Sequence, residues 1–214
     1  MTVLHSAPRP VPVVLDGRYA RLEPLDVSHA ADLFAATSGE GADERYRYLF
    51  ETPPADIAEL SAWIAKAAAL PDYIHYAVID KVSGRCVGRQ ALMRIVPEHG
   101  VIEIGSILWG RGAARTRVAS EAFYLFATHV FDALGYRRFE WKCNDRNEPS
   151  KRAARRFGFA FEGVFRQHMI IKGENRDTAW FSIIDGEWPA LKTRFAAWLD
   201  PGNFDAQGIQ KRAL

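Results

Sequence analysis

The sequence predicts an α/β fold in which helices flank one central sheet, and two patterns support this prediction. Apolar and polar residues alternate as in strands over three consecutive segments, 74–79, 86–95 and 101–109, which are separated by short glycine-containing turns. Apolar residues recur at helical spacing over 57–68 and again over 118–130. The short turns favour an antiparallel meander, and the helices supply the layers that cover it.

The other elements follow from the same reasoning. Before the meander, residues 18–25 alternate as a strand, Asp26 can cap a short helix, and residues 43–50 form an aromatic-rich segment of poor periodicity. Gly135 ends the long helix. The pattern then predicts a strand at 136–143, a short basic helix at 149–157, strands at 161–171 and 178–184, and a last helix carrying Leu191, Phe195 and Trp198.

Length and composition restrict the class of protein. With 214 residues, of which 48% are hydrophobic and 25% charged, the chain predicts one domain over residues 1–200 and an aperiodic, loose tail over 201–214. A net charge of +2 argues against a nucleic-acid-binding protein. The chain shows neither a signal peptide nor an apolar run that could span a bilayer, which predicts a cytoplasmic protein without membrane partners. Six histidines without ligand spacing predict no metal site, and two cysteines in apolar runs predict buried free thiols.

One basic stretch, residues 109–121, separates the third meander strand from the long helix. It holds two glycines and the arginines Arg111, Arg115 and Arg117. A strand that turns into a helix leaves several backbone N–H groups without partners, and the helix dipole adds to their affinity for an anion such as a phosphate. The stretch is therefore a candidate phosphate site, with a solvated basic helix start as the alternative.

Three further motifs follow that helix: Asn147 and Ser150 form an Asn-x-x-Ser motif, Gly158-Phe159 closes the basic helix, and Glu187-Trp188 precedes the last one. With these residues the chain resembles the GNAT superfamily of acyl-CoA-dependent N-acetyltransferases, most closely the branch of ribosomal-protein and N-terminal-alanine acetyltransferases. The resemblance runs from about residue 18 to residue 199. It implies the GNAT fold, a central, mostly antiparallel mixed sheet with one splayed strand pair, flanked by helices. It also implies acetyl-CoA as the co-substrate, inserted between the splayed strands.

The resemblance allows two registers for the pyrophosphate loop. The stretch 109–114 matches a form common in the branch, but it would leave the helix five residues too long. Counting back from Gly135 places the loop at 114–119 instead, with Arg117 where glycine is usual. With this second register, the implied acyl-CoA-binding residues are Ile107, Leu108, Trp109, Ala114, Arg115, Thr116, Arg117, Val118, Ala119, Ser120, Asn147 and Ser150.

The resemblance implies two catalytic candidates. Glu103 lies where some members keep a carboxylate that removes the amine proton, although an ordinary strand charge is the alternative reading. Ser150 is the candidate to hydrogen-bond the leaving sulfur, and it can also cap the basic helix. Ala154 replaces the tyrosine that many members carry, and Met169 replaces a glutamate of the ribosomal-protein branch.

The implied reaction is direct transfer of an acetyl group from acetyl-CoA to a primary amine, either a protein N-terminus or a small molecule. Tyr46 and Tyr48, with the 172–177 loop that contains Asp177, are expected to form the acceptor side. The missing tyrosine and glutamate and the altered loop favour the alternative, a catalytically weak acyl-CoA-binding or regulatory module. Whether the protein is a homodimer is left open.

Overall fold

The computed structural model describes residues 6–214 and contains an eight-stranded sheet in the order β1-β2-β3-β4-β5-β6-β8-β7. All neighbouring strands are antiparallel except β5 and β6, which are parallel. The strands are β1 (Leu15–Asp16), β2 (Ala20–Pro24), β3 (Tyr73–Asp80), β4 (Cys86–Val96), β5 (Val101–Trp109), β6 (Arg138–Asn144), β7 (Ala160–Ile171) and β8 (Glu174–Ile184). The predicted mixed, mostly antiparallel sheet is confirmed.

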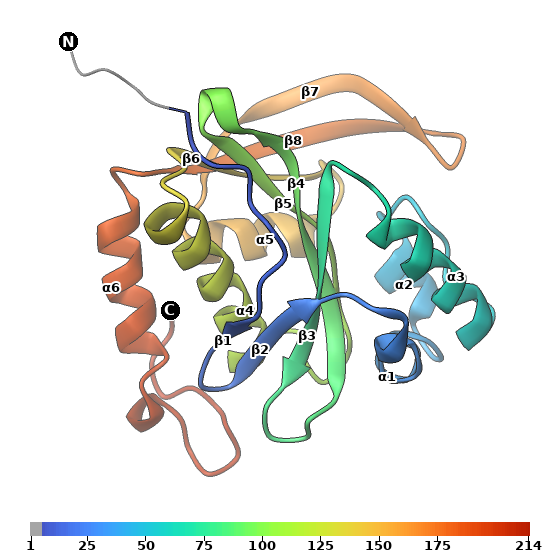
Figure 1. Ribbon diagram of the computed structural model, residues 1–214, viewed down its shortest axis with the longest axis horizontal. Coiled ribbons are helices and arrows are strands. Elements are labelled where there is room, and N and C mark those ends of the chain that lie inside the picture. The colour runs from blue at the N-terminus through green and yellow to red at the C-terminus, as the bar shows by residue number, and fades with distance from the viewer. Residues whose placement is uncertain (1–5) are drawn as a thin grey trace.

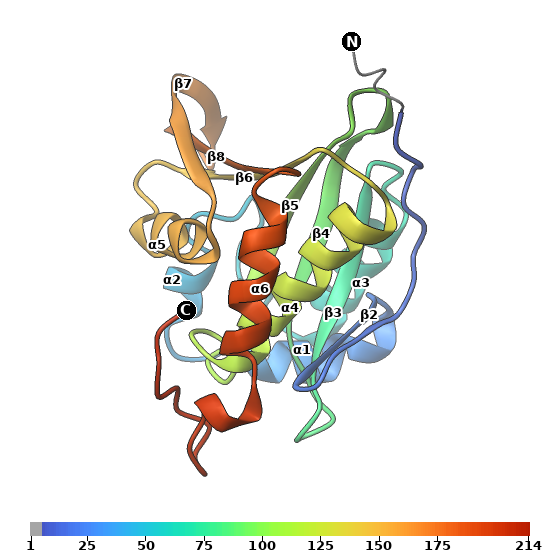
Figure 2. The same ribbon diagram turned by 90° about the vertical axis from the view of Figure 1, so that its left-hand side faces the viewer.

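Helices cover both faces of this sheet (Figures 1 and 2). On one side lie α1 (Ala30–Thr37), α2 (Ala42–Tyr46) and α3 (Ile57–Ala68); on the other lie α4 (Arg117–Thr128), α5 (Glu148–Phe157) and α6 (Trp188–Trp198). A π-helical turn, His129–Ala133, extends α4, and 3₁₀ turns occupy Val27–His29, Pro97–His99 and Pro201–Asn203. No helix in residues 6–214 is long and apolar enough to cross a membrane.

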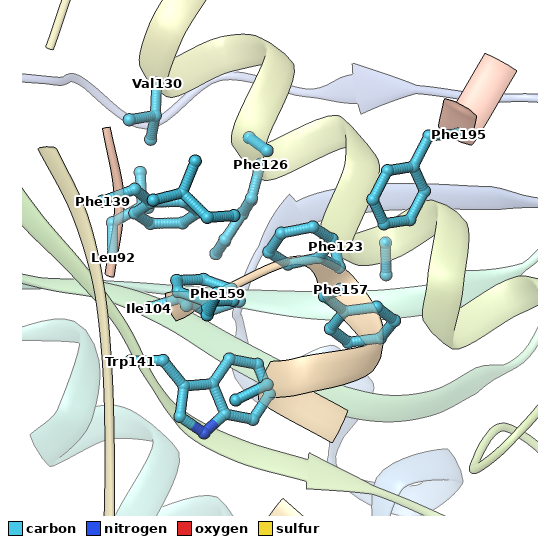
Figure 3. Packing of buried hydrophobic residues seen from close by; sticks show 14 of the residues in the cluster. Leu92, Ile104, Phe123, Phe126, Val130, Phe139, Trp141, Phe157, Phe159 and Phe195 are labelled. Carbon is cyan, nitrogen blue, oxygen red and sulfur yellow. The ribbon is translucent and has the colours of Figure 1, made fainter. Parts of the chain in front are cut away.

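Aromatic side chains hold α4, α5 and α6 together above the sheet (Figure 3). Phe123 of α4 is fully buried and stacks on Phe157 of α5 with ring centroids 4.5 Å apart, and Phe195 of α6 lies 5.4 Å from Phe123. Two rings of β6 extend this cluster: Phe139 lies 6.2 Å from Phe123, and Trp141 lies 6.1 Å from Phe157, between ring centroids. Large buried rings contribute much of the apolar area removed from water, so this cluster fixes how the three helices sit on the sheet.

The sheet opens between its two parallel strands. Residues 101–104 of β5 pair with residues 138–141 of β6, and the pairing ends at Ile104 and Trp141. Both strands continue beyond that point, β5 to Trp109 and β6 to Asn144. In the same region β5 carries a bulge against β4, where Ser106 has a φ of +51°. A bulge bends its strand and increases the local twist, so it accounts for the divergence of β5 from β6. The splayed pair implied by the resemblance is present.

Two local predictions need correction. The segment 172–177 is not a loop: β7 and β8 are joined by the two-residue turn Lys172-Gly173, both with positive φ, and β8 begins at Glu174. Nor is the segment 201–214 a loose tail, although it is aperiodic as expected. Asn203 is buried and holds the chain through bonds with the backbone of Trp198 and Arg212. Side-chain contacts of this kind leave no periodic trace in a sequence.

Candidate active site

A cavity of about 930 Å³ opens where β5 and β6 diverge. Its walls include β5 from Glu103 to Trp109, the chain entering α4, the end of β6 with the start of α5, and the β7–β8 hairpin. The cavity thus contacts the glycine-arginine stretch and the Asn-x-x-Ser motif at once. Its volume is at the upper end of the range typical of small-molecule sites.

The unpaired part of β5 forms one wall of the cavity. Ile107, Leu108 and Trp109 line it, and the edge of β5 beyond Ile104 is free of β6. Backbone N–H and C=O groups on a strand edge need partners, and an extended chain with amide groups can supply them. This wall therefore suits an amide-containing ligand that lies between the strands.

Ser150 lies at the opposite wall, on the first turn of α5. Asn147 caps this helix by accepting the Ser150 N–H at 3.1 Å, so the capping role considered for Ser150 belongs to Asn147. The Ser150 hydroxyl oxygen instead accepts a hydrogen bond from the Trp141 indole at 2.9 Å. This bond occupies one lone pair of the Ser150 oxygen and leaves the hydroxyl proton free to be donated into the cavity.

The start of α4 is a basic opening with free backbone donors. The helix begins at Arg117 with Thr116 as its cap, so its first turn lies within the stretch 114–119. Thr116 accepts the N–H groups of Val118 and Ser120, whereas those of Arg117 and Ala119 have no protein acceptor within residues 6–214. Such a helix start favours an anion.

The C-terminal segment completes this basic end of the cavity. The Arg117 guanidinium lies 4.4 Å from the Tyr19 ring centroid and 5.4 Å from that of Phe204. Residues 207–210 line the same cavity, and Gln210 accepts a hydrogen bond from Trp198 at 3.1 Å. The prediction of a loose tail missed this wall, since only the fold brings residue 204 to residue 117.

Glu103 lies on the sheet at the other end of the cavity, and its side chain is buried. Its carboxylate is 3.0 Å from the Lys142 ammonium and 3.2 Å from the Arg94 guanidinium. Burial raises the pKa of the Glu103 carboxyl, and these two cations oppose part of the rise. Glu103 is therefore a paired, cavity-lining carboxylate rather than an outward strand charge.

Most, but not all, of the other residues assigned to the acyl-CoA and acceptor sites line the cavity. Of the twelve residues assigned to the acyl-CoA site, eleven line the cavity, Ser150 among them. Val118 does not, because it packs in the core beneath the helix start. Tyr48 lines the cavity, but Tyr46 is buried with its hydroxyl 3.3 Å from that of Thr37. Asp177 does not line the cavity either, and it accepts the N–H of Gln167 at a bulge in β7.

Arg89 is a buried side chain that the sequence reasoning overlooked. It forms an ion pair with Glu51, donates to the Ser106 carbonyl at 2.6 Å, and lies 4.2 Å from the Trp63 ring centroid. It thereby ties the bulge of β5 to the segment after α2. An arginine inside a mostly apolar strand was the sequence signal that could have revealed it, because a buried charge requires a partner.

Arg176 also escaped notice, as one residue of a supposed loop. It lines the cavity from β8, donates from Nε to the Thr178 hydroxyl at 3.2 Å, and lies 5.4 Å from the Phe50 ring centroid. The part of the chain that the structure describes contains no group of three His, Cys, Asp or Glu side chains placed to hold a metal ion.

Comparison with known proteins identifies the class. A family model described as an acetyltransferase (GNAT) domain matches residues 20–160, so the chain belongs to the GNAT acetyltransferase family. A GCN5-related N-acetyltransferase from Brucella melitensis is 57% identical, covers 97% of this chain and 95% of its own, and superposes with a TM-score of 0.95. A GNAT-family protein from Chromobacterium violaceum is 39% identical over 88% of this chain and 94% of its own, with a TM-score of 0.82.

Curated relatives match over shorter stretches. The uncharacterized N-acetyltransferase p20 of Bacillus licheniformis is 30% identical over 117 residues, which are 53% of this chain and 63% of p20.

A more distant solved structure is that of an acetyltransferase from Salmonella typhimurium that modifies the N-terminal serine of a ribosomal protein. It is 19% identical, with a TM-score of 0.70, covering 80% of this chain and 99% of its own. At that identity the likeness shows a shared fold.

Proposed function

We propose that this protein transfers an acetyl group from acetyl-CoA to a primary amine, by direct transfer within a ternary complex. One observation carries the proposal: a single cavity joins the unpaired edge of β5, the free N–H groups at the start of α4 and the Ser150 hydroxyl. The strand edge suits the amides of pantetheine, and the helix start suits the pyrophosphate. The basic residues Arg117, Arg152 and Arg156 line the same end and suit the remaining phosphate.

The reaction asks little of the side chains beyond positioning. The amine nitrogen forms a bond to the thioester carbon, the carbon–sulfur bond breaks, and the amine loses one proton. We assign the acceptance of that proton to Glu103, directly or through water, because burial raises the pKa of its carboxyl and thereby makes its carboxylate a better base than an exposed one. Ser150 donates a hydrogen bond to the leaving thiolate, which takes up a proton on release. A free N–H near Leu108 or Trp109 polarises the thioester carbonyl.

The branch within the family is part of the proposal. The Asn147 and Ser150 pair supports a relation to the ribosomal-protein and N-terminal-alanine acetyltransferases, whereas Met169 lines the cavity where that branch has a glutamate. An acceptor site without this carboxylate is expected to differ in its preferred amine. A protein N-terminus and a small amine are both compatible with the reaction.

Two measurements test the proposal. Calorimetric titration with acetyl-CoA should give binding in the micromolar range, and a thiol-release assay over a panel of primary amines should detect turnover. Ser150→Ala should lower kcat by about tenfold or more while leaving the acetyl-CoA Kd nearly unchanged, since the hydroxyl acts on the leaving group. Glu103→Gln should remove the decrease of kcat/KM at acidic pH that protonation of the base causes in the wild-type protein.

The alternative is an acyl-CoA-binding module with weak or no catalysis. Ala154, which replaces a family tyrosine and is fully buried, favours this alternative because it cannot supply an acid. Binding of acetyl-CoA without turnover of any amine would support it. A folded protein that does not bind acetyl-CoA would contradict both functions.

A further inference from the structure

The cavity has a second basic region, separate from the start of α4. We define the acceptor half as seven charged and aromatic residues that line the cavity from the segment after α2, the sheet around Glu103 and β8: Tyr48, Phe50, Glu51, Arg94, Glu103, Lys142 and Arg176. It contains three cations and two carboxylates. Most of these charges already have partners in the folded chain.

The partners can be assigned one by one. Glu51 pairs with the buried Arg89, and Glu103 pairs with both Lys142 and Arg94. Lys142 has a further partner in Glu140, at 2.8 Å. These contacts leave the charges of the sheet region balanced within their own network.

Arg176 is different. Its recorded side-chain contacts are the Nε bond to the Thr178 hydroxyl and the Phe50 ring, and no carboxylate oxygen among residues 6–214 lies within 4.0 Å of its guanidinium nitrogens. The residue is half-buried, and burial lowers the pKa of its guanidinium while the nearby Glu103 carboxylate raises it. An arginine keeps its charge at neutral pH, so this cation has no carboxylate in direct contact within residues 6–214.

Such a cation determines which amine fits. A guanidinium offers parallel N–H donors that match a carboxylate, and a half-buried position strengthens the pair relative to one in water. A second cationic group on the acceptor, as in a polyamine, would instead be repelled by Arg176, and the carboxylates of Glu51 and Glu103 are already paired with other cations. The positive charge of Arg176 also disfavours the ammonium form of an incoming amine and so favours the neutral, nucleophilic form.

We propose that the acceptor is a primary amine that also carries a carboxylate, an amino-acid-like molecule, and that Arg176 binds this carboxylate. The inference rests on the proposed acetyl transfer and names the substrate class of that site. Tyr48 and Phe50 line the same half and give the body of the molecule an aromatic surface.

Paired substrates test the inference. Each amino acid of a panel is compared with its own carboxamide, for example phenylalanine with phenylalaninamide, by release of CoA thiol from acetyl-CoA. The amide has the less basic amine, so a preference for the acid cannot come from the amount of neutral amine. Wild-type protein should show the higher kcat/KM for the acid. Arg176→Gln should raise KM for the acid by about 10- to 100-fold and change KM for the amide less than twofold.

The control variant is Arg166→Gln, which removes an exposed β7 arginine outside the cavity and should leave both substrates unaffected. Arg176→Lys should restore part of the preference for the acid, because the charge returns without the paired donors. Higher kcat/KM with the amides, or equal losses on both substrates in Arg176→Gln, would overturn the inference and leave acetyl transfer standing. Absence of turnover with every carboxylated amine would also overturn it, and acetyl-CoA titration of the same sample then reports separately on the proposed function.

Discussion

Replacing Arg89 by methionine should destabilise the protein markedly and weaken acetyl-CoA binding. The side chain is 1% exposed and has two polar partners, the Glu51 carboxylate and the Ser106 residue at the bulge of β5. Methionine fills much of the same space but leaves Glu51 without its partner. Breaking a fully buried ion pair on one side costs about 3–5 kcal/mol, and the 22% exposure of Glu51 lowers the expected loss to about 2–4 kcal/mol.

Urea denaturation followed by tryptophan fluorescence measures this loss of unfolding free energy. The double variant Arg89→Met/Glu51→Gln should recover about 1–2 kcal/mol of it, because it removes the unpaired charge that the single variant leaves behind. Lys81→Met is the matched control: its ion pair with Asp16 is solvent-exposed, so the expected change is below about 1 kcal/mol.

The functional part of the same prediction concerns the bulge. Arg89 holds the carbonyl of Ser106, whose φ of +51° lies in the left-handed region. Losing that bond should allow β5 to relax, which would raise the acetyl-CoA Kd at a temperature where both proteins are folded. Two results would refute the role of Arg89 as a buried ion-pair partner that holds β5: a free energy of unfolding of Arg89→Met within about 0.5 kcal/mol of wild type, or a double variant no more stable than the single one.

Three further predictions follow from the same structure. Arg117→Gln should raise the acetyl-CoA Kd by about 10- to 100-fold, because it removes a cation beside the free N–H groups of α4. Arg166→Gln is the control and should leave that Kd unchanged. Both values are measured by calorimetry, and equal affinities for the two variants would mean that the phosphates bind at another place. Phe123→Ala should lower the free energy of unfolding by about 3–5 kcal/mol, since its ring is fully buried and stacked; a loss below about 1 kcal/mol in urea denaturation would mean that the core refills the space. The paired bonds from Arg138 hold the pKa of Glu162 at about 2, below its ordinary value of 4.5. The stability that Glu162 contributes relative to Glu162→Gln should therefore be full above pH 4.5 and decrease as the pH falls toward 2, and a difference that grows on acidification would contradict the pairing.

Local patterns in the sequence determined most of the secondary structure. The alternation over 101–109 predicted β5 with its correct bounds, and the glycines at 135 and 158, both with positive φ, follow the last turns of their helices. These features depend on residues close together in the chain, where side-chain period and backbone freedom act directly. The resemblance, with its helix length counted back from Gly135, placed the pyrophosphate loop at 114–119, and α4 begins at Arg117 within that stretch.

Only the tertiary structure decided which side chains meet. Glu51 lies 38 residues from Arg89, and Phe204 lies 87 residues from Arg117, yet each pair is in contact in the folded protein. No periodicity records such a contact, because the energy of an ion pair or a stacked ring depends on where the sheet and helices bring the chain together. For the same reason the sequence reasoning considered Ser150 as the cap of the basic helix, whereas in the structure Asn147 caps it. The folded chain also places the Trp141 indole within hydrogen-bond distance of the Ser150 hydroxyl, and Ser150 lines the cavity between β5 and β6.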